Sequence, residues 1–317
     1  MIDLERANRS GHPIHEINNC AATIARGLGW RERMQDLKGK VAVITGGGSG
    51  LGREFALRCA ARGMKLVLGD VDEAGMQETL NQVKAMDAEI ESATMRLDVS
   101  KLEQVQAFAD LAKNRFGGAH LLFNNAGVSV GGPVWMNTQA DWEWVVGVNV
   151  YGVAWGLKAF IPMMIEQGEG HVVNVASAAG WVNGPSMAVY NATKHSVVAM
   201  SETLALDLRD VGATNIGVTV LCPAFFPTGI HDSARNRPAD MADTLAPSAI
   251  DQERAAALKA AVEKGRVKAP DVAEMTLKAV ESDQFYVFPH RKIKQLIAMR
   301  AAAADRETTV FDSMNPQ

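Results

Sequence analysis

The stretch Val41-Ala42-Val43-Ile44-Thr45-Gly46-Gly47-Gly48-Ser49-Gly50-Leu51-Gly52 decides the fold of this chain. Its first four residues are apolar and mostly β-branched, which is typical of a strand buried on both faces. The glycines permit left-handed backbone angles and open a predicted helix over residues 50–62, whose free N–H groups and positive dipole end attract phosphate. A tight turn without a ligand would carry similar glycines, so both interpretations stay open on this stretch alone.

The next predicted strand, residues 65–69, is followed at once by Asp70. A carboxylate at the end of this strand can accept hydrogen bonds from both ribose hydroxyls of adenosine and repels a 2′-phosphate, which favours NAD over NADP. The alternative is that Asp70 only caps the helix that begins near Asp72 and Glu73.

Further polar motifs follow in a fixed order: Leu97-Asp98-Val99, Asn124-Asn125-Ala126-Gly127, Asn149, Ser177, and Tyr190 with Lys194. Each has a structural alternative when taken alone. Tyr190 and Lys194 have the same-face spacing of any helix, a serine after a strand is often a turn residue, and a buried asparagine can simply be hydrogen-bonded. Their joint occurrence in this order favours a catalytic site.

With these motifs the chain resembles the short-chain dehydrogenase/reductase family, in the branch with Thr-Gly-x-x-x-Gly-x-Gly and Tyr-x-x-x-Lys, over residues 37–290. The resemblance implies that Asn149, Ser177, Tyr190 and Lys194 are catalytic. It also implies NAD contacts from Gly46, Ser49, Gly50, Leu51, Gly52, Asp70, Asp98, Val99, Asn125, Ala126, Gly127, Tyr190, Lys194, Pro223 and Thr228. Ser49 stands where relatives that prefer NADP often carry a basic residue. Ala224 departs from the family, which has glycine after this proline, and alanine restricts the backbone angles there.

The chemistry explains these residue types. A tyrosine has a pKa of about 10 and is a poor base at neutral pH. Lys194 and the positively charged nicotinamide both favour the phenolate, so we expect the pKa of Tyr190 to be lowered and Tyr190 to act as general acid/base. Ser177 would hydrogen-bond the carbonyl or alkoxide oxygen. By resemblance, Lys194 also holds the nicotinamide ribose, and Asn149 holds a water that relays the proton.

Strands and helices alternate, which predicts a single α/β domain with a doubly wound parallel sheet. The predicted strands are 41–45, 65–69, 92–97, 120–124, 170–175, 216–222 and 285–288. The predicted helices are 50–62, 73–86, 101–116, 139–167, 186–211, 250–264 and 271–282. The resemblance implies a Rossmann-like fold with seven strands in the order 3-2-1-4-5-6-7, over residues 39–291.

Three segments are treated apart from this core. The family's substrate lid corresponds to about residues 224–268, and the chain has an N-terminal extension, 1–38, and a C-terminal tail, 292–317. Apolar residues in the extension and an amphipathic spacing in the tail fit either an oligomer contact or a helix on its own domain. Residues 308–317 are expected to be frayed.

Large apolar residues surround the path to Ser177 and Tyr190. The predicted substrate contacts are Ser177, Trp181, Met187, Tyr190, Phe225 and Phe226, with Val182, Met241, Leu245 and Ile250 nearby. Such a pocket predicts a hydrophobic secondary alcohol or ketone, cyclic or aromatic, because a sugar or hydroxy acid would leave polar groups unpaired. The alternative is that Phe225 and Phe226 only pack the lid onto the core.

Composition excludes other classes. A net charge of −4 over 317 residues gives no basic surface for nucleic acid or an anionic membrane, and the three cysteines have neither metal-ligand spacing nor a disulfide framework. We find no run of about eighteen apolar residues to span a bilayer. These features predict a cytoplasmic protein without a metal site. We also expect a homodimer or homotetramer. The predicted activity is that of an NAD-dependent alcohol dehydrogenase/ketone reductase; the alternatives are an epimerase or dehydratase of the same fold, or a non-catalytic NAD-binding regulator.

Overall fold

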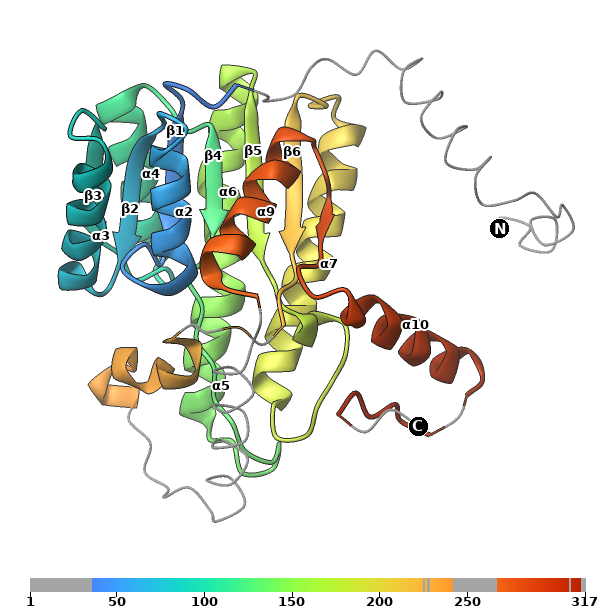
Figure 1. Cartoon of the computed structure of the whole chain (residues 1–317). Helices are drawn as coiled ribbons and strands as arrows, with labels where there is room; N and C mark the ends of the chain where they lie inside the picture. Colours follow the sequence, from blue (N-terminus) through green and yellow to red (C-terminus); the bar gives the residue numbers. More distant parts are fainter. Residues whose placement is uncertain (1–35, 225, 227–228, 242–266, 308, 315–317) are drawn as a thin grey trace, which may run out of the picture.

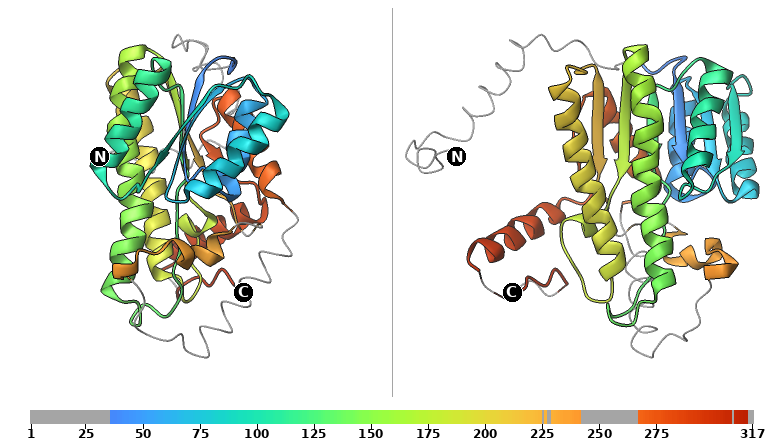
Figure 2. Two further views of the ribbon diagram at one scale, coloured as in Figure 1. Left: turned by 90° about the vertical axis from the view of Figure 1, so that its left-hand side faces the viewer. Right: turned by 180° about the vertical axis from the view of Figure 1, so that it is seen from behind.

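The structure, a computed structural model of the whole chain, describes residues 36–224, 226, 229–241, 267–307 and 309–314. Seven parallel strands form one sheet in the order β3-β2-β1-β4-β5-β6-β7. Helices cover both faces of the sheet (Figures 1 and 2). The predicted α/β class and strand order are confirmed.

The strands are β1 (Val41–Thr45), β2 (Lys65–Asp70), β3 (Ser92–Arg96), β4 (Leu121–Asn124), β5 (Gly170–Val175), β6 (Ile216–Leu221) and β7 (Tyr286–Val287). The α-helices are α2 (Gly50–Ala60), α3 (Glu73–Met86), α4 (Leu102–Phe116), α5 (Gln139–Val146), α6 (Gly152–Gln167), α7 (Ala188–Asp210), α9 (Ala269–Glu281) and α10 (Lys292–Asp305). Short helices are η1 (Gly147–Tyr151), η2 (Ala178–Gly180), η3 (Gly229–Asn236) and η4 (Ala239–Met241). The predicted helix 250–264 and the N-terminal residues 1–35 lie outside the described residues.

The core has two layers, one on each face of the sheet. Helices α2, α3 and α9 pack on one face and α4, α6 and α7 on the other. Phe55 stacks on Phe123 in the first layer at a centroid distance of 4.3 Å, and Phe108 meets Phe160 edge-on in the second. Every residue of β1, β4, β5 and β6 is buried, as expected for strands covered on both faces. Leu37, near the start of the described residues, already belongs to the first layer.

The predicted helix 139–167 is continuous but not uniform. Residues Gly147–Tyr151 form a π-helical turn between α5 and α6. Gln139–Gln167 is long and apolar enough to cross a membrane by length and composition, with a mean hydropathy of 1.3, although polar residues such as Asn149 and Lys158 interrupt it. Half of its apolar window is buried inside the domain, where the helix packs against α4 and α7. This burial accounts for its composition.

The parallel arrangement brings all carboxyl ends of the strands to one edge of the sheet, the lower edge in Figure 1. The loops after β1, β2, β4, β5 and β6 gather there, together with η3, η4 and the start of α10. The fold therefore collects residues that are far apart in sequence around one end of the sheet.

Candidate active site

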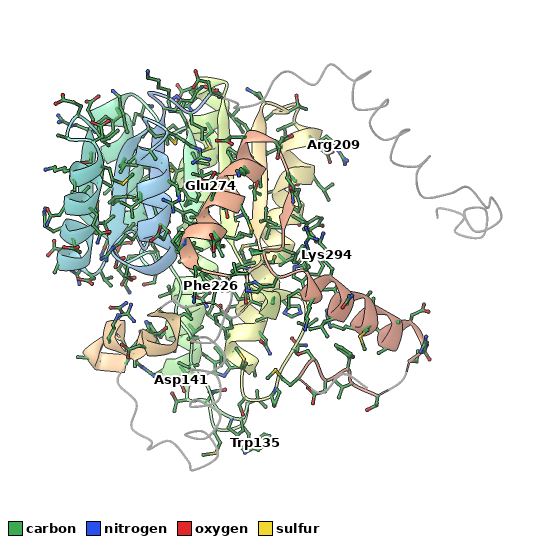
Figure 3. All side chains as sticks on the ribbon, in the orientation of Figure 1. Trp135, Asp141, Arg209, Phe226, Glu274 and Lys294 are labelled. Carbon is green, nitrogen blue, oxygen red and sulfur yellow. The ribbon has the colours of Figure 1, made fainter. Side chains whose placement is uncertain are left out.

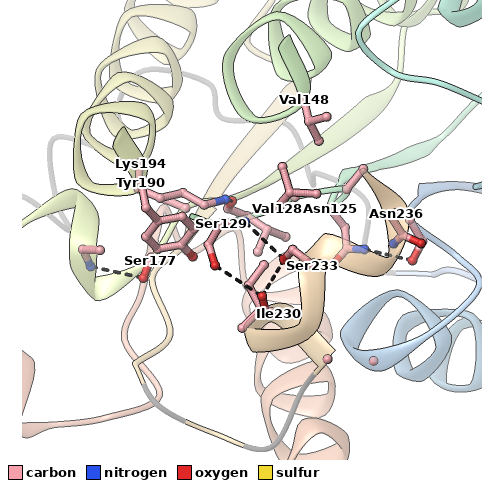
Figure 4. A pocket seen from close by; sticks show the side chains of 18 of the residues that line it. Asn125, Val128, Ser129, Val148, Ser177, Tyr190, Lys194, Ile230, Ser233 and Asn236 are labelled. Carbon is pink, nitrogen blue, oxygen red and sulfur yellow. Dashed lines mark hydrogen bonds between the residues drawn. The ribbon is translucent and has the colours of Figure 1, made fainter. Parts of the chain in front are cut away.

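A cavity of about 700 Å³ opens at the carboxyl ends of the strands. It extends from Asp70, after β2, to Met314 near the end of the chain. Ser177, Tyr190 and Lys194 lie together on one side of it, and Asn125 lies on the other (Figure 4). The cavity thus joins the glycine turn to the predicted catalytic side chains.

The glycine turn has the backbone that its sequence predicts. Gly46 and Gly50 have positive φ angles of 69° and 51°. A Cβ on Gly52 would lie 2.0 Å from the Gly46 carbonyl oxygen, so only glycine fits where the turn meets α2. Ser49 makes no side-chain cap on α2, which leaves the first N–H groups of the helix for a ligand. Gly46, Ser49 and Gly50 line the cavity, whereas Gly52 packs beneath the turn.

Asp70 lines the cavity with its carboxylate held in place. Its Oδ2 accepts a hydrogen bond from Gly48 N at 2.8 Å and its Oδ1 accepts one from Asp72 N at 3.0 Å. Burial raises the pKa of Asp70, while these backbone donors act in the opposite direction. Asp72, not Asp70, caps α3 by accepting from Gly75 N. The capping alternative for Asp70 therefore does not hold.

Arg53 is the first cation of α2, and its guanidinium makes hydrogen bonds inside the protein. Its Nη2 donates to the carbonyl oxygens of Gly48 and Gly75, and its Nε donates to Thr79 Oγ1 at 3.0 Å. Arg53 does not line the cavity. The guanidinium of Arg53 is therefore bonded within the protein, while the charged residues near the glycine turn that line the cavity are Asp70, Asp98 and Lys101.

Thr45 joins the glycine turn to the Asn-Asn-Ala-Gly segment after β4. Thr45 Oγ1 accepts hydrogen bonds from the backbone N–H groups of Asn125 and Ala126. Asn125 Nδ2 in turn donates to the Thr45 carbonyl at 2.8 Å. The other predicted cofactor residues that line the cavity are Leu51, Asp98, Val99, Asn125, Ala126, Gly127 and Pro223. Thr228 lies outside the described residues.

Asn124 itself turns away from the cavity into the sheet. Its Nδ2 donates to Asn174 Oδ1 on β5, and Asn174 Nδ2 donates to Ser201 Oγ on α7, both at 2.9 Å. All three side chains are buried. This chain of polar contacts ties the two central strands to the helix that carries Tyr190 and Lys194.

Ser177 and Tyr190 lie close enough for Ser177 to lower the pKa of the Tyr190 phenol, and Ser177 Oγ donates to the Pro223 carbonyl at 3.3 Å. Ser177 Oγ also accepts from Ala179 N at 3.1 Å, which orients the hydroxyl at the end of β5. Burial raises the pKa of Tyr190 to about 12, and the neighbouring Ser177 hydroxyl acts against this rise. The expected lowering of the Tyr190 pKa is therefore wrong for the protein alone, because removing the phenolate from water outweighs the neighbouring groups.

Lys194 lies one helical turn beyond Tyr190 on α7 and is buried. Its Nζ donates to the Val175 carbonyl at 2.8 Å and lies 5.6 Å from the centroid of the Tyr190 ring. Burial lowers the pKa of Lys194 to about 8. The lysine therefore loses part of its positive charge at mildly alkaline pH, which weakens its effect on the phenol.

Asn149 lies in the π-helical turn, fully buried. Its Oδ1 accepts from Val128 N, and its Nδ2 donates to the Val128 carbonyl and to Thr193 Oγ1, at 2.9 to 3.0 Å. Both amide hydrogens are used, so the side chain holds the loop after β4 in place beside Lys194.

The substrate end of the cavity differs in part from the prediction. Val182, Met187, Phe226 and Met241 line it. Trp181 does not, which corrects its predicted role as a substrate contact: its ring packs against Tyr286 and Phe288, and its Nε1 donates to Cys222 Sγ. Phe225, Leu245 and Ile250 lie outside the described residues.

Sequence reasoning missed two groups that shape the cavity. Ser233 of η3 accepts a hydrogen bond from Ser129 N at 3.1 Å, which joins the loop after β6 to the loop after β4 (Figure 4). The end of the chain also lines the cavity, through Ile293, Leu296, Ser313 and Met314. The amphipathic spacing of the tail was visible in the sequence, but nothing in it indicated which surface the tail would cover.

Comparisons with known proteins agree with this geometry. The family model for the short chain dehydrogenases matches residues 40–239. A CLA biosynthesis dehydrogenase/reductase of Lactiplantibacillus plantarum is 34% identical over 271 residues, which cover 84% of this chain and 93% of that protein. Estradiol 17-beta-dehydrogenase 11 of Homo sapiens is 33% identical over 219 residues, which cover 69% and 71% of the two chains.

Among solved structures, a short chain dehydrogenase/reductase from Burkholderia phymatum in complex with NAD has a TM-score of 0.85 and 45% sequence identity. The similarity covers 88% of this chain and 99% of that chain. A doubly wound sheet with a glycine turn, a strand-end aspartate and a buried serine, tyrosine and lysine around one cavity defines an oxidoreductase that uses a dinucleotide. The chain belongs to the short-chain dehydrogenase/reductase family.

Proposed function

We propose that this protein oxidises a hydrophobic secondary alcohol to its ketone, and catalyses the reverse reduction, with NAD(H) as cofactor. The observation that carries the proposal is the placement of Tyr190, beside Ser177 and one turn from Lys194, in a cavity that continues to the glycine turn. The geometry supplies a proton acceptor, a group for the reacting oxygen and a dinucleotide cradle in one place.

Each side chain has a defined part in this mechanism. NAD, when bound, supplies the hydride acceptor and a positive charge on the nicotinamide ring. Ser177 holds the substrate oxygen, and Tyr190 Oη takes the hydroxyl proton in oxidation or returns it in reduction. Lys194 holds the nicotinamide ribose and favours the phenolate. Asn149 keeps the loop after β4 in register with Lys194, since its side chain is bonded to Val128 and Thr193.

We propose NAD rather than NADP as the preferred cofactor. Asp70 presents a carboxylate fixed by Gly48 N and Asp72 N, which suits two ribose hydroxyls and repels a 2′-phosphate. Arg53, the cation closest to the turn in sequence, is held by carbonyl oxygens and Thr79. The name of the Burkholderia phymatum structure, which records NAD, agrees with this choice.

The proposed substrate class rests on the apolar side of the cavity. Val182, Met187, Phe226 and Met241 surround the end where Ser177 and Tyr190 meet the substrate. A buried hydroxyl without a partner costs about 1 to 3 kcal/mol, so a polyol would bind poorly against these side chains. The name of the human relative gives a steroid alcohol as its substrate, a cyclic and apolar secondary alcohol.

The test is a screen for NADH formation from cyclic, aryl and polyhydroxylated secondary alcohols. We expect larger kcat/KM values for cyclic or aryl alcohols than for polyols. An epimerase or dehydratase of this fold, or a non-catalytic NAD-binding regulator, would bind NAD without net NADH formation. A polyol turned over faster than every cyclic or aryl alcohol would contradict the substrate class.

We also propose that the protein is a cytoplasmic homo-oligomer. Tyr151, 50% exposed, stacks on Trp155 along the outer side of α6, and Ile165 on the same helix is 43% exposed. Large apolar side chains on the outside of a core helix favour contact with a second copy. Sedimentation of the protein and of Tyr151→Ser tests this, and a wild-type monomer would contradict it.

A further inference from the structure

The C-terminal segment, residues 290–314, begins beside the loop that follows β6. His290 Nδ1 accepts a hydrogen bond from Ala224 N at 3.2 Å, and its ring centroid lies 6.5 Å from that of Phe226. Ile293, in the first turn of α10, is 8% exposed and lines the cavity. The start of this segment is therefore fixed against one wall of the candidate active site.

The rest of the segment runs out along α10 and turns back toward the loop between β5 and α7 (Figure 1). Arg300 Nη1 donates to the Trp181 carbonyl at 2.9 Å, and Ser313 Oγ donates to the Asn183 carbonyl at 2.6 Å. This loop connects Ser177 to the helix of Tyr190. The C-terminal segment is thus bonded to both loops that flank the catalytic side chains.

Two side chains of the segment face the cavity at its substrate end. Leu296 of α10 and Met314 both line it. Met314 Cγ lies 3.5 Å from the place where a Cβ on Gly184 would be, so the methionine packs directly beside Gly184. Met314 is also 59% exposed, which places it between the cavity and solvent. Asp70 follows β2, which is separated from β5 by β1 and β4, so Asp70 lies away from the end of the cavity that Leu296 and Met314 line.

We infer that Leu296 and Met314 are specificity-determining residues, which limit the size of the group carried by the alcohol carbon. This inference rests on the proposed function and adds to it a wall contributed by the end of the chain. An apolar side chain at the mouth of the cavity clashes sterically with a bulky substrate ring and makes van der Waals contacts with a smaller one. The glycine turn and the catalytic hydrogen bonds do not involve either residue.

The experiment compares kcat/KM for cyclohexanol and cyclododecanol, two cyclic secondary alcohols that differ in size. Met314→Ala removes part of the wall, so we expect the ratio of cyclododecanol to cyclohexanol to rise about tenfold. Met314→Trp enlarges the wall and should lower the ratio by a similar factor. The matched control is Met299→Ala, because Met299 lies on α10 but does not line the cavity. The KM for NAD should stay unchanged in all three variants.

An unchanged ratio in both Met314 variants would overturn the inference, as would an equal change in Met299→Ala. If the wild type oxidises neither alcohol, the proposed function has failed and the wall is tested by binding. The readout is then the rise in melting temperature that cyclododecanone gives to the NAD-loaded protein. The rise should be larger for Met314→Ala than for Met314→Trp, and equal rises would contradict the inference.

Discussion

Arg237 and Asp141 form a buried ion pair, with 2.8 Å between Nη1 and Oδ1 and side-chain exposures of 7% and 8%. The pair joins the segment between η3 and η4 to the first turn of α5. The Arg237 guanidinium also lies 5.2 Å from the centroid of the Trp144 ring, and Trp144 lines the cavity. One buried contact thus positions the loop after β6 over the candidate active site.

Arg237→Met should lower the free energy of unfolding by about 3 kcal/mol, because it leaves the Asp141 carboxylate buried without its cation. The substrate KM should rise more than kcat falls, since the catalytic hydrogen bonds are untouched. Chemical denaturation and steady-state kinetics measure both effects. Arg209→Met is the control, because Arg209 is exposed at the opposite end of the domain (Figure 3). Equal stability of the two variants would contradict the prediction.

Tyr190→Phe should keep the fold and the affinity for NAD while kcat falls by about a hundredfold to ten-thousandfold, because only the transferable proton is lost. Tyr151→Phe provides the matched control, since Tyr151 is half exposed at the end of η1. The measurements are kcat and NAD binding by fluorescence. If Tyr190→Phe retained more than about half of the wild-type kcat, Tyr190 would not be the acid/base.

Lys194→Met should raise the KM for NAD and lower kcat, and an unchanged KM would contradict a role in holding the ribose.

The pKa of Lys194 should also make the free energy of unfolding depend on pH. Burial lowers the pKa of Lys194 from 10.5 to about 8, so the unfolded chain binds the proton more tightly. Between these two values the wild type should gain stability relative to Lys194→Met as pH rises, by up to about 3 kcal/mol. Urea unfolding at several pH values measures this gain, and parallel curves for the two proteins would exclude it.

Asp70 sets the cofactor preference in our proposal. We expect kcat/KM to favour NAD over NADP by at least about tenfold, or 1.4 kcal/mol, in the wild type. Asp70→Ser should reduce this preference, because the carboxylate no longer repels a 2′-phosphate. Asp72→Ala removes the cap of α3 and should lower stability by about 1 kcal/mol while leaving the preference intact. Equal loss of preference in both variants would show that Asp70 acts only through the local backbone.

The sequence predicted the parts of the fold that depend on local pattern. The apolar strands, the glycine turn and the spacing of Tyr190 and Lys194 are local features, and the structure has each element within a few residues of its predicted ends. The π-helical turn at Asn149 could not be predicted, because it depends on bonds to Val128 and Thr193. These partners are distant in sequence.

Trp181 shows the same limit at the candidate site. Its place between Ser177 and Tyr190 in sequence predicted a substrate contact, but the ring packs on Tyr286 and Phe288, whose strand is reached a hundred residues later. The Arg237 ion pair and the position of the chain end are likewise tertiary contacts. Most residues assigned from motifs line the cavity, although Gly52 and Asn149 do not, whereas residues assigned from proximity in sequence line it only in part.

The C-terminal wall of the cavity has a consequence for the order in which the protein is made. The glycine turn, Asp70 and the segment after β4 leave the ribosome well before Met314, which follows all of them in the sequence. A growing chain can therefore assemble its dinucleotide cradle before the substrate side of the cavity is closed.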